Sequence, residues 1–200
     1  MKPIFLVGTV VVLLASSTPV LAGEPLERVK GTLEAALAVL NDPGLQGPEK
    51  EAERKAGVRK IIYDRFNFEE MAKESLGVHW AKLTIQQRKE FVDLFGDLFE
   101  RSYSRLVLKF LPERETLYGT EAIDGDRALV KTTLVSKKNE KLPVDYQLRK
   151  KGPRWDLYDV VIDGVSIVGN YRTQFNKIIR LSSYETLIKK MKIKQEEGSF

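Results

Sequence analysis

Hydrophobic and polar residues alternate along two neighbouring stretches in the second half of the chain. In residues 142–149 every second side chain is apolar, which is the pattern of a strand with one buried face. Residues 154–162 begin with the same alternation and end in the run Val160-Val161-Ile162, which is apolar on both sides. A strand of that kind is covered on both faces, or it faces something apolar that is not protein.

Short polar turns separate four such stretches, and Asp124-Gly125-Asp126 is typical of them. The predicted strands are residues 116–123, 127–136, 142–149 and 154–162. Consecutive strands joined by short turns form an antiparallel meander. We therefore expect a curved, four-stranded antiparallel sheet.

Helical periodicity occupies the chain before and after these strands. The predicted helices are residues 24–41, 49–65, 67–76, 84–112, 165–181 and 183–193. Asn67 with Glu70, and Thr84 with Gln87, have the spacing of capping boxes. Helices on either side of a meander predict an α+β fold with the helices on one face of the sheet. A long helix across the concave face leaves a space that side chains or a ligand must fill.

The first residues have the pattern of an export signal. Lys2 precedes an apolar run, residues 4–15, that is too short to span a bilayer. Val20-Leu21-Ala22 offers the small residues that signal peptidase reads, so we place the cleavage site after Ala22. Residues 1–22 are then a signal peptide, and residues 23–200 form one domain outside the cytoplasm.

The composition argues against several classes of site. The chain has no cysteine and one histidine, which excludes disulfides and disfavours a transition-metal site. The net charge of +5 is mild, and a nucleic-acid surface would need a more basic chain with interleaved exposed aromatic residues. We expect no cofactor and no nucleic-acid partner.

Catalytic groups are few. Gly164-Val165-Ser166 begins like a nucleophile elbow, but Val168 stands where that motif needs glycine. Asp145, Asp159 and Asp163 lie near strand ends, where ion pairs or turn caps are their ordinary roles. We expect that the protein is not an enzyme, although a hydrolase or isomerase using the same cavity is the main alternative.

Two blocks of residues resemble a known family. The segment 66–72, FNFEEMA, followed by Leu76-Gly77 and Trp80, is similar to the F-D-F-x-x-M-A…L-G…W segment of the MlaC family, with asparagine in place of aspartate at position 67. The second block resembles that family's later signature and comprises Val144-Asp145-Tyr146, Trp155, Tyr158-Asp159-Val160, Gly164-Val165-Ser166, Asn170-Tyr171-Arg172 and Phe175. These proteins are periplasmic phospholipid-binding proteins, also called toluene-tolerance proteins.

The resemblance implies a fold similar to nuclear-transport-factor-like and cystatin-like domains, with a lipid cavity between sheet and helices. It implies a monomeric shuttle that carries glycerophospholipid between an outer-membrane lipoprotein complex and an inner-membrane ABC transporter. No catalytic residue and no cofactor come with it. A periplasmic protein-interaction module with a solid core is the other alternative.

The predicted lipid-binding residues are apolar and aromatic positions on three elements of the predicted fold. They are Phe95, Phe99 and Tyr103 on the long helix; Val130, Leu134, Val144, Tyr146, Leu148, Val160 and Ile162 in the sheet; and Val165, Ile167 and Tyr171 after the last strand.

Overall fold

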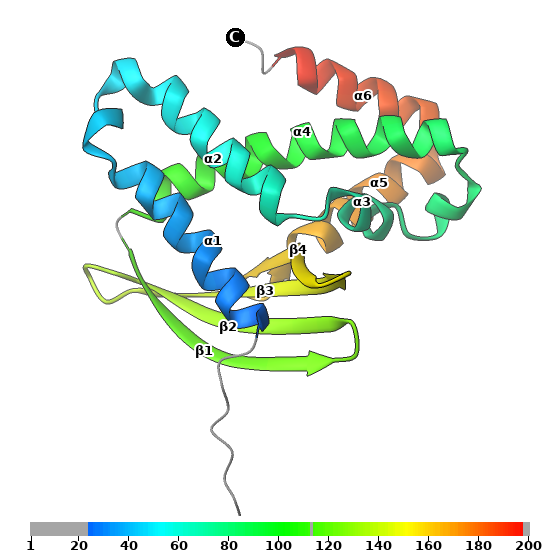
Figure 1. Ribbon diagram of the computed structural model, residues 1–200. Coiled ribbons are helices and arrows are strands. Elements are labelled where there is room, and N and C mark those ends of the chain that lie inside the picture. Colours follow the sequence, from blue (N-terminus) through cyan, green and yellow to red (C-terminus); the bar gives the residue numbers. More distant parts are fainter. Residues whose placement is uncertain (1–23, 113, 198–200) are drawn as a thin grey trace, which may run out of the picture.

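The structure is a computed structural model, and it describes residues 24–112 and 114–197. The predicted export signal lies outside these residues. All the described helices lie on one side of an antiparallel sheet (Figure 1). The helices are α1 (Glu24–Asn41), α2 (Glu51–Arg65), α3 (Phe68–Leu76), α4 (Ile85–Phe110), α5 (Ile167–Leu181) and α6 (Tyr184–Glu197), with the short 3-10 helices η1 (Pro43–Leu45), η2 (Pro48–Lys50) and η3 (Gly77–Lys82).

The sheet is a meander in which each strand pairs with the next in the chain. Its strands are β1 (Arg114–Asp124), β2 (Arg127–Ser136), β3 (Lys141–Lys151), β4 (Arg154–Ile162) and β5 (Val165–Ser166). The register shifts between β1 and β2 near Tyr118, and between β3 and β4 near Leu148. Bulges of this kind bend and twist the strands that carry them.

The four-strand prediction was wrong by one short strand. Val165 and Ser166, expected as the first residues of a helix, pair with Ile162 and Val161 of β4. The intervening residues Asp163 and Gly164 both have positive φ, at 49° and 77°, so the chain reverses tightly and returns along β4. The helix then begins two residues later than predicted, at Ile167.

Local sequence signals fix the starts of α3 and α4. Thr84 and Gln87 form the predicted capping box, in which each side chain bonds to the other's backbone N–H. Asn67 accepts a hydrogen bond from the backbone N–H of Glu70 at 3.1 Å. The Glu70 side chain does not bond back to the backbone N–H of Asn67, because its carboxylate pairs with Arg149 of β3 instead.

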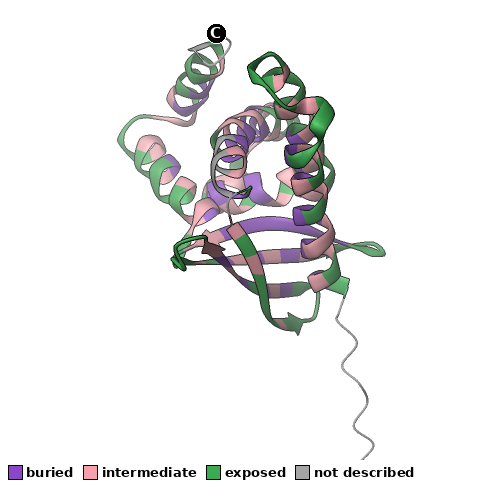
Figure 2. Cartoon of the chain, turned by 90° about the vertical axis from the view of Figure 1, so that its left-hand side faces the viewer, coloured by how far each residue is buried: buried purple, intermediate pink, exposed green. Residues whose placement is uncertain are grey.

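The core lies between the helix layer and the sheet, where buried residues gather on the facing surfaces (Figure 2). A continuous aromatic cluster joins α4 to α5, and Phe91, Phe95 and Phe175 are its centre. Their ring centroids lie 5.7–6.2 Å apart, which is the usual spacing of packed aromatic pairs. This cluster fixes α5 against α4.

Polar contacts attach α1 to the sheet. Arg28 pairs with the buried carboxylate of Asp156 in β4 at 3.1 Å, and the indole N–H of Trp155 donates to Glu24 at 3.2 Å. The backbone N–H of Leu26 donates to Glu121 of β1 at 2.7 Å. These contacts lie in the first turns of α1. The remainder of α1 and α2 lie above the sheet, and together we call them the α1–α2 wall (Figure 1).

Candidate functional site

An apolar cavity of about 280 Å³ lies between this wall, the C-terminal half of α4 and the strands β2–β4. Its lining combines segments that are far apart in the sequence. The lining residues are Thr32, Leu33, Ala36, Val58, Ile61, Ile62, Phe66, Tyr103, Val107, Leu111, Leu134, Leu142, Val144, Tyr146, Leu157, Val160 and Ile162. None of these side chains carries a formal charge at neutral pH.

Three lining residues have polar side-chain atoms. Thr32 donates its hydroxyl to the carbonyl of Arg28 at 2.7 Å, so its polar group is satisfied within α1. Burial raises the pKa of Tyr103 and of Tyr146 far above the usual value for tyrosine. Both phenols therefore stay neutral at every physiological pH, and among the described lining residues hydroxyl groups are the only polar side-chain groups.

Six of the thirteen predicted lipid-binding residues lie together on this lining. They are Tyr103, Leu134, Val144, Tyr146, Val160 and Ile162. The strand residues among them point to the helix side of the sheet, because they occupy the apolar phase of the strand alternation. Contact of these residues with a ligand stays a prediction.

The other seven predicted residues do not line the cavity. Phe95 and Phe99 are fully buried in the aromatic cluster, where Phe99 stacks on Tyr103 with ring centroids 4.3 Å apart. Val130 and Leu148 are fully buried as well, and they fill the packed part of the sheet's inner face. These four side chains belong to the buried core cluster and are not among the lining residues.

The three residues predicted after β4 lie away from the cavity, because the chain forms β5 before α5 begins. Val165 lies in β5 with 59% of its surface exposed. Ile167 and Tyr171 lie on α5, half-buried against the core cluster, and the Tyr171 ring packs on Phe95 and Phe175 instead of reaching the cavity.

Sequence reasoning missed the wall formed by α1 and α2. Val58, Ile61 and Ile62 are the main apolar residues of a highly charged helix, and all three line the cavity. Leu33 and Ala36 of α1 line the same cavity. A short apolar stripe on a charged helix predicts burial, but it does not say whether the buried face meets side chains or a void.

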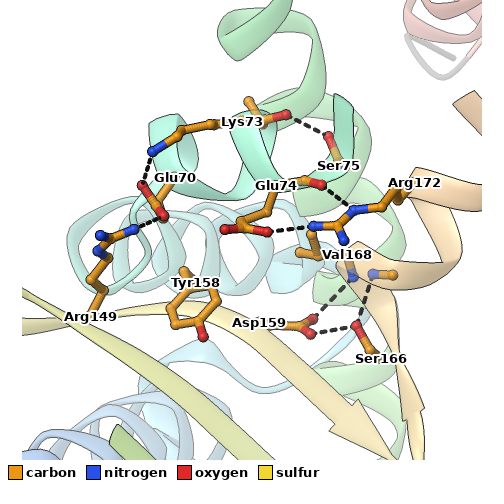
Figure 3. Close-up of polar contacts among 12 residues, drawn as sticks. Glu70, Lys73, Glu74, Ser75, Arg149, Tyr158, Asp159, Ser166, Val168 and Arg172 are labelled. Carbon is orange, nitrogen blue, oxygen red and sulfur yellow. Dashed lines mark hydrogen bonds and ion pairs between the residues drawn. The ribbon is translucent and has the colours of Figure 1, made fainter. Parts of the chain in front are cut away.

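The three carboxylates considered for catalysis lie outside the lining. Asp159 is buried, and it accepts hydrogen bonds from Ser166 Oγ and from the backbone N–H groups of Val160 and Val168 (Figure 3). Burial raises the pKa of Asp159, and the hydrogen bonds lower it in part. Asp163 is exposed at the β4–β5 turn, and Asp145 is half-buried within β3.

Asp159 therefore links β4 to the start of α5 and holds the helix N-terminus in place. Its oxygens already have three donors, and Ser166 Oγ in turn accepts from the N–H of Gly169 at 2.8 Å. The histidine at position 79 bonds to Asn176 at 3.0 Å instead of to this serine. The elbow-like sequence 164–166 is thus a turn and helix cap.

A second polar group joins α3 to its neighbours. Arg149 of β3 pairs with Glu70, and Arg172 of α5 pairs with Glu74 (Figure 3). Lys73 lies 3.7 Å from the Glu70 carboxylate. These pairs join α3 to β3 and α5, and none of their side chains is among the described lining residues of the cavity.

Within residues 24–112 and 114–197, no His, Cys, Asp or Glu side chains cluster in a way that could hold a metal ion. In the same residues, no helix combines the length and the apolar character needed to cross a bilayer.

A protein-family comparison matches the model of the MlaC protein family to residues 30–193, which is most of the chain. The chain belongs to the MlaC family. The matched residues include both the α1–α2 wall and the sheet, so the family assignment covers every element that lines the cavity.

Two curated MlaC relatives show the extent of the similarity. The intermembrane phospholipid transport system binding protein MlaC of Haemophilus influenzae is 23% identical over 138 residues, which cover 67% of this chain and 64% of that protein. The toluene tolerance protein ttg2D of Pseudomonas putida is 24% identical over 157 residues, covering 78% of this chain and 73% of that protein. The chain thus matches slightly less than two thirds of the Haemophilus protein's length.

A solved structure has the same fold. The phospholipid-binding protein of Ralstonia solanacearum, determined in complex with a phospholipid, superposes with a TM-score of 0.75 at 22% sequence identity. The superposition covers 88% of this chain and 98% of the Ralstonia chain.

Proposed function

We propose that this protein is a periplasmic phospholipid carrier. It takes up glycerophospholipid in the cavity and moves it between an outer-membrane lipoprotein and porin complex and an inner-membrane ABC transporter, which maintains outer-membrane lipid asymmetry. The observation that carries the proposal is an uncharged, apolar cavity between sheet and helices in a chain of the MlaC family. The names of the Haemophilus relative and the Ralstonia neighbour, both phospholipid proteins, support it.

The physical need for such a cavity follows from the cost of exposing acyl chains to water. Transfer of one methylene group out of water is worth about 0.8 kcal/mol, so two chains of about 16 carbons would cost on the order of 25 kcal/mol in the open periplasm. A carrier must bury the chains, whereas the charged head group can stay in water. An uncharged lining meets the first requirement.

The cavity as observed is smaller than its proposed cargo. At about 30 Å³ for each water-sized group, 280 Å³ accommodates roughly nine such groups, which is part of one acyl chain. Lipid uptake therefore requires the helix wall and the sheet to separate further. The α1–α2 wall is held by the first turns of α1 on the sheet, by the N–H of Asn67, just after α2, on the carbonyl of Leu157, and by Arg59 and Tyr63 of α2 on Asp97 of α4. Widening of the cavity needs some of these contacts to open.

The proposal is tested by expressing the full chain in a Gram-negative host and purifying it from the periplasm. Organic extraction followed by mass spectrometry should release phospholipid, and delipidated protein should take up labelled phospholipid from vesicles. The intact mass of the periplasmic protein also tests cleavage after Ala22, and its size in solution tests the monomer.

A matched control for uptake is Val78→Trp, because Val78 is 76% exposed and lies outside the cavity lining. This variant should take up lipid as the unmodified chain does. A clean extract together with no uptake from vesicles would contradict the proposal, and would favour a protein-interaction module.

A further inference from the structure

The side chain of Tyr103 has one unusual property among the residues that line the cavity. Its ring lies on the lining, but its hydroxyl oxygen is buried and has no hydrogen-bond partner within the described residues. The other lining tyrosine differs, because the hydroxyl of Tyr146 is not among the described buried side-chain atoms that lack a partner. A buried hydroxyl without a partner is rare in native proteins, and a phenylalanine would fill the same space without that penalty.

Tyr103 lies on the cavity lining near side chains that are partly exposed. Val107, one helical turn further along α4, is half-buried, as are Leu142 and Ile162 at the edge of the lining. One turn of helix corresponds to about 6 Å along α4. A lipid that enters beside these half-buried residues with its phosphate in water would carry its ester groups to about the depth of Tyr103.

The chemistry of the hydroxyl defines what it can bind. Burial, with Tyr146 and Asp159 nearby, raises the pKa of the Tyr103 phenol, so the group keeps its proton and can donate it in a hydrogen bond. A charged acceptor would be expensive in this apolar space, but the carbonyl of an acyl ester is neutral. The cavity must widen to admit lipid. In the widened cavity an acyl ester carbonyl can reach the buried hydroxyl of Tyr103.

We propose that the Tyr103 hydroxyl donates a hydrogen bond to an ester carbonyl of the bound lipid, so that the cavity prefers diacyl lipids over dialkyl ethers with equal chains. This inference rests on the proposed phospholipid-carrier function. It assigns Tyr103 as a residue that selects the linkage between glycerol and hydrocarbon chain, and it gives the unpartnered hydroxyl a partner in the lipid-bound state.

The test compares dipalmitoyl phosphatidylglycerol with its di-O-hexadecyl ether analogue, each displacing a fluorescent phospholipid from delipidated protein. The unmodified chain should bind the ester about three- to tenfold more tightly than the ether, which is the range of one neutral hydrogen bond. Tyr103→Phe should bind both lipids with equal affinity. Tyr184→Phe is the matched control, because its hydroxyl bonds to the carbonyl of Gln87 at 3.2 Å, away from the lining, and it should keep the ester preference.

Thermal unfolding of the delipidated proteins provides a second measurement. Tyr103→Phe should melt about 2–4 °C higher than the unmodified chain, because the substitution removes a buried group that lacks a partner. Equal binding of ester and ether by the unmodified chain, or an unchanged preference in Tyr103→Phe, would overturn the inference while leaving the carrier function standing. Failure of the unmodified chain to bind either lipid would refute the carrier function, and the inference with it.

Discussion

Substitution of Val144 by tryptophan separates a cavity from a solid core. Val144 lies on the cavity lining in β3, and the indole adds roughly seven non-hydrogen atoms to the side chain. The cavity of about 280 Å³ accommodates roughly nine water-sized groups, so the indole fits and occupies most of it. We expect Val144→Trp to fold with nearly unchanged thermal stability and to lose lipid uptake.

The same substitution in packed core should behave differently. Val130, on the neighbouring strand β2, is fully buried and does not line the cavity. Overpacking there should cost about 1–3 kcal/mol, which for a domain of this size lowers the melting temperature by about 2–12 °C. Val130→Trp is therefore the matched control for Val144→Trp.

Two measurements decide the outcome: thermal unfolding of each delipidated variant, and uptake of labelled phospholipid from vesicles. The reasoning would be refuted if Val144→Trp lost as much stability as Val130→Trp, because the space beside Val144 would then be filled. It would also be refuted if Val144→Trp kept full uptake, because the lipid would then bind elsewhere.

Three further predictions concern the polar contacts that hold the helices around the cavity. Asp159→Ala should cost about 1–3 kcal/mol in urea unfolding, since it leaves Ser166 and the N–H of Val168 without their acceptor. Burial raises the pKa of Asp159 above 3.8, so the folded state favours the protonated form. The free energy of unfolding should therefore fall as pH rises from about 4 through the folded pKa. Asp159→Asn should flatten this dependence of unfolding free energy on pH. Arg28→Ala, which removes a partner of the buried Asp156, should cost more than Arg172→Ala, whose ion pair with Glu74 is partly exposed and worth less than about 1 kcal/mol. Equal losses in urea unfolding for the two arginine variants would contradict this ranking.

Local sequence determined most of the secondary structure. Alternation placed β2 at its observed bounds, because a strand with one buried face repeats every two residues, whereas the apolar run 160–162 followed by Gly164 marked the end of β4. The Thr84–Gln87 box fixed the start of α4, because its donors and acceptors lie within four residues. The same period also placed Leu134, Val144 and Val160 on the inner face of the sheet, where they meet the cavity.

Tertiary structure decided where the apolar surfaces leave a space. Phe95, Phe99 and Tyr103 belong to one stripe of α4, yet α5 covers the first part of that stripe with Tyr171 and Phe175, and the cavity begins only at Tyr103. An apolar pattern states which side chains leave water. It does not state whether the groups opposite them fill the space, because that depends on how neighbouring elements are placed.

The same reason explains the other differences between expectation and structure. The partner of Glu70 is Arg149, 79 residues away, so no short-range motif could assign it. The two residues of β5 form a strand only by pairing with β4, so their own pattern could not predict it. Sequence alone determined the elements, their apolar faces and the family resemblance, whereas the α1–α2 wall, the extent of the cavity and the unpartnered hydroxyl of Tyr103 exist only once distant segments pack together.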